Sequence, residues 1–219
     1  MHDVGAVAGG GARALTPDST RNRVINPILL DIPESFETPR LLIRVPRPGD
    51  GPELNAAVLE TFDDLHPWMP WARERPSVEQ SEEYSRRSYA QFITREDITL
   101  RLIHKESGLI LGCSGVHPRD WNVPRFEIGY WCRKRFQGQG YTTEAVRGIL
   151  RFGFENLGAK RIEVHCDSLN LRSLRVAERA GLRREAEFPN GLTSPNGELR
   201  TKVVFGMTDE HWNAFNARR

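Results

Sequence analysis

The chain has 219 residues, which is enough for one domain built around a single buried core. Its 31 Lys and Arg nearly balance its 29 Asp and Glu, and a net charge of +2 gives no reason to expect nucleic acid or a membrane surface as a partner. No apolar run approaches the length of a membrane span. Three cysteines without a Cys-x-x-Cys pair, and six histidines without zinc-type spacing, predict no metal site and a reducing, cytoplasmic location.

The sequence predicts one folded domain with less ordered segments at both ends of the chain. The first 26 residues are rich in Gly, Ala and Arg and show no sustained periodicity. We therefore expect a flexible leader and lead-in over residues 1–36, one folded domain over 37–210, and a C-terminal tail over 211–219. An alternative start codon at Val24 would remove most of the leader.

Hydrophobic periodicity and turn residues predict an α/β domain around a mixed sheet. The strand at 98–104 and the next one form a hairpin around the turn at 106–108. Ser77, with Gln80 three residues later, has the pattern of a capping box at the start of the second helix. In chain order we expect a strand at 41–45, helices at 53–62 and 77–94, strands at 98–104, 109–117 and 126–132, a helix from about 142, a strand at 161–167, a helix from 170 to 181, and strands near 182–188 and 199–207.

A glycine-rich turn joins the strand at 126–132 to the helix that follows it. The turn reads Arg-Phe-Gln-Gly-Gln-Gly over residues 135–140, and the helix is expected to end at Gly158. The first N–H groups of a helix have no partner within the helix, and they lie at the positive end of its dipole. Two glycines without side chains leave these groups accessible, so the turn predicts a phosphate-binding loop that needs no lysine.

Three kinds of phosphate loop can be compared with this turn. A P-loop requires Gly-Lys-Ser/Thr, whereas Gly140 is followed by Tyr141. A dinucleotide fingerprint requires a small residue at the position of Thr143, where threonine fits poorly. The third kind, Arg/Gln-x-x-Gly-x-Gly/Ala, is matched by Arg135, Gly138 and Gly140. From the turn alone, a glycine-rich connection without any ligand stays open.

A second motif follows in the helix after the strand at 161–167. This helix begins with Asn-x-x-Ser, at Asn170 and Ser173. Together with the loop, it resembles the GNAT acetyltransferase superfamily over about residues 37–207. The resemblance implies a single-domain GNAT fold, with a mixed, mostly antiparallel sheet of about seven strands flanked by about four helices and splayed between the fourth and fifth strands. It also implies acetyl-CoA as co-substrate, with its pyrophosphate in the loop and its pantetheine arm at Asn170, and no metal.

Three further segments narrow this resemblance to the branch that contains the ribosomal-protein N-terminal acetyltransferases. They are Glu-Ile-Gly-Tyr-Trp at 127–131, the region 191–205, and the Trp/Pro-rich segment 65–71, which lines the acceptor pocket in that branch. Trp68, Met69 and Trp71 are thereby implied as acceptor-binding residues, with core packing as the other interpretation. The implied function is transfer of an acetyl group from acetyl-CoA to a primary amine, a protein or peptide N-terminus, by direct attack in a ternary complex.

The resemblance also implies roles for individual residues. Glu127 is implied as the general base, acting through a water, and Ser173 as the acid toward the departing thiolate. The alternatives are an ion pair of Glu127 with an arginine, and a Ser173 that only satisfies its own helix. A backbone N–H within 130–132 would polarise the thioester carbonyl. The implied cofactor-binding residues are Tyr130, Trp131, Cys132, Arg135, Gln137, Gly138, Gln139, Gly140, Tyr141, Thr142, Thr143 and Asn170.

Other functions stay open on the sequence. They are a non-catalytic acyl-CoA-binding regulatory module, an enzyme that acetylates a small-molecule amine, and a dinucleotide-dependent oxidoreductase, which the threonine at 143 disfavours. Cys132 stands where the family more often has leucine, and no neighbouring base in the sequence supports it as an acetyl-carrying nucleophile. The sequence is compatible with a monomer or a homodimer.

Overall fold

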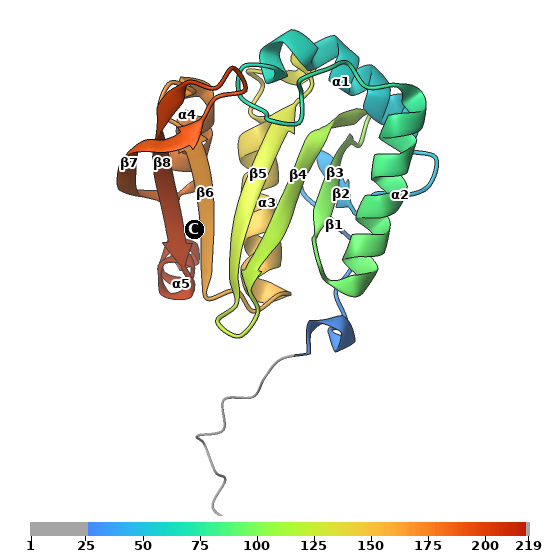
Figure 1. Ribbon diagram of the computed structural model, residues 1–219. Coiled ribbons are helices and arrows are strands. Elements are labelled where there is room, and N and C mark those ends of the chain that lie inside the picture. The colour runs from blue at the N-terminus through green and yellow to red at the C-terminus, as the bar shows by residue number, and fades with distance from the viewer. Residues whose placement is uncertain (1–25, 218–219) are drawn as a thin grey trace, which may run out of the picture.

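The computed structural model describes residues 26–217, in which one eight-stranded sheet lies between two layers of helices (Figure 1). Helices α1 and α2 cover one face, and α3 crosses the other, where α4 packs beside it. The elements are a short 3-10 helix Pro27–Leu29, β1 Ser35–Glu37, β2 Leu41–Arg44, α1 Gly51–Leu65, α2 Val78–Thr94, β3 Thr99–His104, β4 Ile110–Asp120, β5 Arg125–Cys132, a 3-10 helix Lys134–Phe136, α3 Tyr141–Glu155, β6 Arg161–Asp167, α4 Leu171–Ala180, β7 Arg183–Thr193, β8 Leu199–Thr208 and α5 Asp209–Asn216.

The sheet opens into a wedge between β5 and β6. The strand order is β1-β2-β3-β4-β5-β6-β8-β7, and β5 and β6 are the one parallel pair in it. These two strands pair only where Arg125 to Glu127 lies against Arg161 to Glu163, and beyond Glu127 they diverge. The predicted splay between the fourth and fifth strands is confirmed, because the strands then predicted in those places are β5 and β6.

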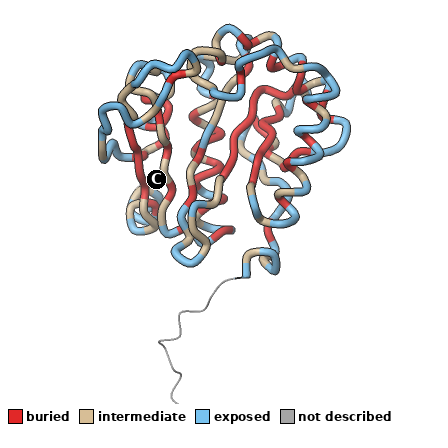
Figure 2. The backbone as a smooth tube through the Cα atoms, viewed as in Figure 1, coloured by how far each residue is buried: buried red, intermediate tan, exposed pale blue. Residues whose placement is uncertain are grey.

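The main core fills the space between the sheet and α3. Val146 and Ile149 of α3 are fully buried with Ile128 of β5, and the buried residues run along the central strands and the inner side of α3 (Figure 2). Gly153 lets α3 lie close to β6, because a Cβ atom there would come within 2.5 Å of Ile162 Cδ1. The period-3.6 pattern read from the sequence thus fixes which side of α3 faces the sheet.

Three helix signals read from the sequence are confirmed, at Ser77, Asn170 and Gly181, whereas a fourth is wrong, because α3 ends at Glu155 with Asn156 as its C-cap and not at Gly158. Ser77 accepts a hydrogen bond from the Gln80 N–H, and the Gln80 side chain accepts one from the Ser77 N–H, as in a capping box. Asn170 caps α4 by accepting from the Ser173 N–H at 3.1 Å, and Gly181 ends the helix with φ +104°. These local side-chain signals place the start of α2 and both ends of α4 within one residue of the expected positions.

The structure has one strand and one helix more than expected. Strand β1 is only three residues long, which is too short for a period-2 pattern to be recognised, and it pairs with β2. Helix α5 lies where a C-terminal tail was predicted, and its Trp212 is buried and stacks on Phe154 of α3. Helix α5 is therefore held against the domain by Trp212, its buried residue. The leader prediction falls mainly on residues 1–25, outside the described residues.

Candidate active site

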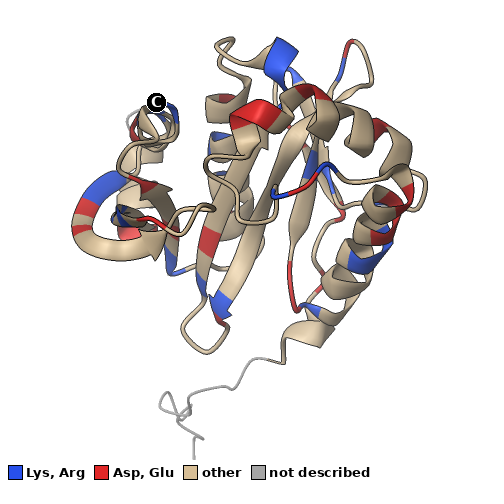
Figure 3. Cartoon of the chain, turned by 45° about the horizontal axis from the view of Figure 1, so that its top comes forward, with Lys and Arg blue, Asp and Glu red and all other residues tan. Residues whose placement is uncertain are grey.

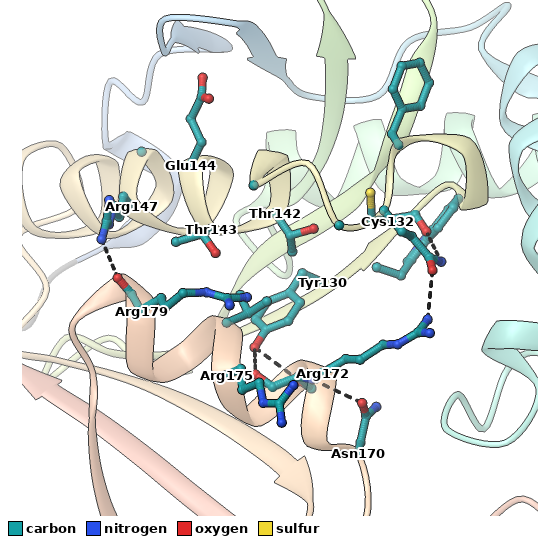
Figure 4. A pocket seen from close by; sticks show the side chains of 18 of the residues that line it. Tyr130, Cys132, Thr142, Thr143, Glu144, Arg147, Asn170, Arg172, Arg175 and Arg179 are labelled. Carbon is teal, nitrogen blue, oxygen red and sulfur yellow. Dashed lines mark hydrogen bonds between the residues drawn. The ribbon is translucent and has the colours of Figure 1, made fainter.

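A cleft of 1620 Å³ opens at the wedge between β5 and β6. It extends between α3 and α4 on one side of the sheet and reaches the end of α1 and the segment after it. Its lining combines the glycine-rich turn, the starts of two helices and the end of β5 (Figure 4). Most of the residues singled out from the sequence therefore meet at one place in the fold.

The glycine-rich turn has the backbone of a phosphate cradle. Gly138 and Gly140 adopt φ values of +75° and +82°, which other residues rarely adopt, and α3 begins directly after them. Thr142 and Thr143, in the first turn of α3, line the cleft together with both glycines. The first N–H groups of the helix are therefore close to the cleft, as an anion site requires.

Of two arginines near this turn, Arg135 was expected at the cleft, but Arg40, which was not singled out from the sequence, lines the cleft instead. Arg135 does not line the cleft, because its guanidinium is bound to Glu60 of α1, with Nη2 2.5 Å from Oε2. Hydrogen bonds from Arg135 and Arg133 lower the pKa of Glu60 to about 2. Arg40, between β1 and β2, does line the cleft, and its Nη1 donates to the Gln139 carbonyl at 3.1 Å. The side chain that holds the turn thus comes from a distant part of the sequence.

Of the other residues predicted at the turn, some face the cleft and some do not. Gln137 lines it, whereas Gln139 and Tyr141 are not part of the lining. Tyr141 packs under the turn, with its hydroxyl 3.0 Å from His104 Nε2 and the Arg40 guanidinium 4.0 Å from its ring centroid. Tyr141 therefore supports the turn from behind, whereas Gln139 is exposed and its Nε2 donates to the Arg135 carbonyl within the turn at 2.8 Å.

The start of α4 meets the end of β5 across the wedge. The Tyr130 hydroxyl donates to the Ser173 carbonyl at 2.9 Å, and the Ser173 hydroxyl donates to the Tyr130 oxygen at 3.2 Å (Figure 4). Ser173 Oγ is also 3.1 Å from Cys166 Sγ. Burial raises the pKa of Tyr130, so the phenol stays protonated and can donate. Asn170, Ser173 and Tyr130 all line the cleft.

Glu127 lies on β5 at the closed end of the wedge, and its side chain is on the face of β5 opposite to that of Tyr130, which lines the cleft. It is the last residue of β5 that pairs with β6, and the alternation of a strand places it on the face opposite to Tyr130. Its Oε2 accepts from Arg119 Nη2 at 2.8 Å and is 3.1 Å from His165 Nδ1. His165 Nε2 is 2.9 Å from Glu163 Oε2. Glu127 does not line the cleft, so its geometry matches the ion-pair alternative, and its role as base stays a prediction.

The Trp/Pro-rich segment lies beside Trp131 of β5. Trp68 and Met69 line the cleft, and Met69 also packs on a small core cluster around Phe62 and Leu65. Trp71 is 52% exposed and does not line the cleft, although its ring centroid is 6.3 Å from that of Trp131. Met69 therefore has the core contact of the second interpretation, and acceptor binding by Trp68, Met69 and Trp71 stays a prediction.

Cys132 also lines the cleft, close to the turn. Burial raises the pKa of its thiol to about 11, so the thiol is protonated near neutral pH. A protonated thiol is a poor nucleophile, which agrees with the absence of a neighbouring base in the sequence. Within residues 26–217, no group of three or more His, Cys, Asp or Glu side chains is placed to hold a metal ion.

The sequence did not single out the arginines of the cleft. Arg172, Arg175 and Arg179 of α4 line it together with Arg147 and Arg151 of α3. The three arginines of α4 follow an i, i+3, i+7 spacing, which would have placed them on one face of the predicted helix. The sequence therefore shows that the three arginines share one face of the helix, but it does not show that this face lines the cleft.

Comparisons with known proteins find one matching family model and several similar chains. The model of the acetyltransferase (GNAT) domain family matches residues 40–183, a range that contains the glycine-rich turn and the start of α4. YdaF of Bacillus subtilis (strain 168), named "Putative ribosomal N-acetyltransferase", is 28% identical over 176 residues, 78% of this chain and 93% of YdaF. The ribosomal-protein-serine acetyltransferase of Escherichia coli (strain K12) is 27% identical over 133 residues, 56% of this chain and 73% of the relative.

A solved structure has the same fold. The microcin C7 self-immunity acetyltransferase MccE, in complex with acetyl-CoA and AMP, superposes with a TM-score of 0.72 at 20% identity, over 78% of this chain and 93% of that chain. Among the helices within residues 26–217, none is long and apolar enough to cross a bilayer.

Proposed function

The chain belongs to the GNAT acetyltransferase family and is an acetyl-CoA-dependent N-acetyltransferase, and from this premise we propose that its acceptor is the α-amino group of a protein or peptide N-terminus. The names of relatives that act on ribosomal proteins support this acceptor class. An α-amino group has a pKa of about 7.7–8.0, so it loses its proton far more easily than a lysine with a pKa of about 10.4. Such an acceptor places little demand on the base.

The observation that carries the proposal is the lining of the cleft at the end of α1. Asp63 and Asp64 line the cleft together with Trp68 and Trp131, so this part of the lining combines carboxylates and aromatic rings, although Asp63 also accepts a hydrogen bond from Arg75 Nη2 at 2.9 Å. Carboxylates attract an N-terminal ammonium group, and the rings offer contact area to the first side chains of a peptide. The cleft volume of 1620 Å³ exceeds the about 300–1,000 Å³ of typical small-molecule sites, which leaves room for a peptide beside the donor.

The residues of the donor side fit acetyl-CoA, which supplies the acetyl group when it is bound. The N–H groups after Gly138 and Gly140 would hold its pyrophosphate, and the wedge beside Asn170 would take the pantetheine arm. The N–H groups of β5 beyond Glu127 no longer pair with β6, and one of them, within 130–132, would polarise the thioester carbonyl.

Two side chains then move protons. Glu127, through a water, would take the proton of the attacking amine at the closed end of the wedge. The amine nitrogen forms a bond to the carbonyl carbon as the carbon–sulfur bond breaks, and the sulfur leaves with the electron pair. Ser173, turned from Tyr130 toward the wedge, would give its hydroxyl proton to that thiolate.

A peptide screen tests the acceptor. The purified protein and acetyl-CoA are mixed with peptides that have a free α-amino group, and thiol release is measured. The matched controls are the same peptides with a blocked N-terminus and an added lysine, and polyamines and aminoglycosides are tested alongside. We expect release only with free N-termini. Release with blocked lysine peptides or small amines alone would assign another acceptor, and stoichiometric acetyl-CoA binding without any release would support a regulatory module.

Arg40 and Arg135 give a second test, on the donor side. We expect Arg40→Ala to raise the Kd for acetyl-CoA about tenfold, because a charged hydrogen bond contributes about 1.5–3 kcal/mol and Arg40 holds the carbonyl of Gln139 at the cleft. Arg135→Ala is the matched variant, and we expect a change below about threefold because its guanidinium binds Glu60 outside the cleft. Calorimetric titration measures both, and the reverse order would restore the role predicted for Arg135 from the sequence.

A further inference from the structure

A row of arginines lines the cleft on the side away from the acceptor rim. Arg172, Arg175 and Arg179 lie on one face of α4, and Arg147 and Arg151 of α3 line the same cleft. The seven residue steps from Arg172 to Arg179 span about 10 Å along the helix. Figure 4 shows Arg147 and Arg179 between the two helices and Arg175 on α4 next to Arg179. The row therefore begins at the wedge and continues away from it.

Carboxylates do not neutralise the end of this row. Arg172 Nη1 donates to Gln137 Oε1 at 3.0 Å, and Arg151 Nη2 donates to the Glu37 carbonyl at 2.9 Å. Among residues 26–217, no hydrogen bond or ion pair engages the guanidinium of Arg175 or that of Arg179. Elsewhere, as along α2, acidic and basic residues are interspersed (Figure 3). Two guanidiniums without an acidic partner, beside further arginines, form a site for an anion.

The position of the row indicates which anion it binds. Arg172 reaches Gln137 in the glycine-rich turn, so the row starts where the pyrophosphate of the donor is expected and continues along α4. Acetyl-CoA carries one further phosphate, a monoester on the 3′-oxygen of its ribose. A phosphomonoester offers three terminal oxygens with close to two negative charges, and guanidinium groups bind such oxygens in bidentate fashion.

We propose that Arg175 and Arg179 bind the 3′-phosphate of the donor, so that the enzyme distinguishes CoA thioesters from thioesters of 3′-dephospho-CoA. The proposal rests on the donor site of the proposed function and does not depend on which amine is the acceptor. It assigns the two arginines a role in donor selection, separate from the cradle of the pyrophosphate at Gly138 and Gly140.

The test is a calorimetric comparison of two ligands on two proteins. Acetyl-CoA and 3′-dephospho-acetyl-CoA are titrated into the wild-type protein and into the double variant Arg175→Ala/Arg179→Ala. The two ligands differ only in the 3′-phosphate. We expect the wild type to bind acetyl-CoA about 30-fold more tightly than the dephospho ligand, because charge-assisted hydrogen bonds are the strong class of such contacts. In the double variant we expect this preference to fall to about threefold or less, as two such contacts are lost.

Two further variants serve as controls. Arg86→Ala/Arg87→Ala removes the same charge from the exposed face of α2, and we expect it to keep the full preference. Arg175→Lys/Arg179→Lys keeps the charge without the planar fork, and we expect an intermediate preference. Arg175 and Arg179 are exposed, as are Arg86 and Arg87, so an unchanged thermal unfolding curve is expected for every variant.

Three results would overturn the proposal. The first is a wild-type protein that binds both ligands equally. The second is a double variant that loses affinity for both ligands by the same factor, which would assign the arginines to the pyrophosphate. The third is a double variant with unchanged donor binding but a raised KM for acidic acceptor peptides. Failure of both ligands to bind the wild type would instead contradict the donor site itself.

Discussion

Replacing Glu127 with glutamine is expected to lower kcat about 100-fold or more, because a positioned general base contributes about 10²–10⁴-fold to the rate. Glutamine keeps the size of the side chain but cannot accept the proton of the amine. The Kd for acetyl-CoA should stay within about twofold of the wild-type value, because Glu127 does not line the cleft on the donor side. Steady-state kinetics with a peptide acceptor, together with calorimetric titration of the donor, measure both quantities.

The position of Glu127 explains why a residue outside the cleft lining could act as the base. Glu127 and Glu163 are the last paired residues before β5 and β6 diverge, so the carboxylate of Glu127 lies at the closed end of the wedge. His165 lies between the two carboxylates, with Nδ1 3.1 Å from Glu127 and Nε2 2.9 Å from Glu163. A proton taken up at Glu127 therefore has the imidazole of His165 within hydrogen-bonding distance, and that imidazole in turn contacts the carboxylate of Glu163.

Arg119→Gln is the control that separates a base from a structural ion pair. Arg119 is 49% exposed and binds Glu127 at 2.8 Å, so this variant removes the ion pair and leaves the carboxylate in place. Exposed ion pairs contribute about 0–1 kcal/mol, and we expect kcat to fall less than about fivefold. Equal and small losses for Arg119→Gln and Glu127→Gln would show that Glu127 only pairs with its arginine, and the search for the base would move to another group or to water.

The sequence predicted the backbone of the site better than its side chains. Gly138 and Gly140 predicted a turn and a helix start because positive φ angles are a local property, and Asn170 predicted a cap for the same reason. The direction of Arg135 was not predictable, because it depends on Glu60, which is 75 residues away in the sequence. Arg40 was missed for the same physical reason, since it reaches Gln139 across 99 residues. Local signals thus fix elements, and tertiary contacts decide which side chains enter the cleft.

The C-terminal helix α5 also depends on a tertiary contact that local sequence signals do not reveal. Helix α5 has only eight residues, which is too short to give a clear period of 3.6, and the sequence therefore predicted a tail. Thr208 caps the helix by accepting from the His211 N–H at 3.3 Å. What holds the helix in place is the burial of one aromatic ring. Trp212 is 7% exposed and stacks on Phe154 of α3, with ring centroids 5.4 Å apart and an interplanar angle of 18°.

Trp212→Ala should accordingly lower the free energy of unfolding by about 3–5 kcal/mol, the usual range for removing a buried Trp or Phe ring. For a chain of this size each kcal/mol corresponds to about 2–4 °C in Tm, so thermal unfolding should show a decrease of about 6–20 °C. Asn213→Ala, at the next position of the same helix and exposed, is the matched control, and its free energy of unfolding should change by less than about 0.5 kcal/mol. If the two variants unfold at the same temperature, the ring does not stabilise the domain and the segment after residue 210 behaves as the predicted tail. A large difference would instead make α5 part of the domain that holds α3, and with it the phosphate cradle at the start of α3, in place.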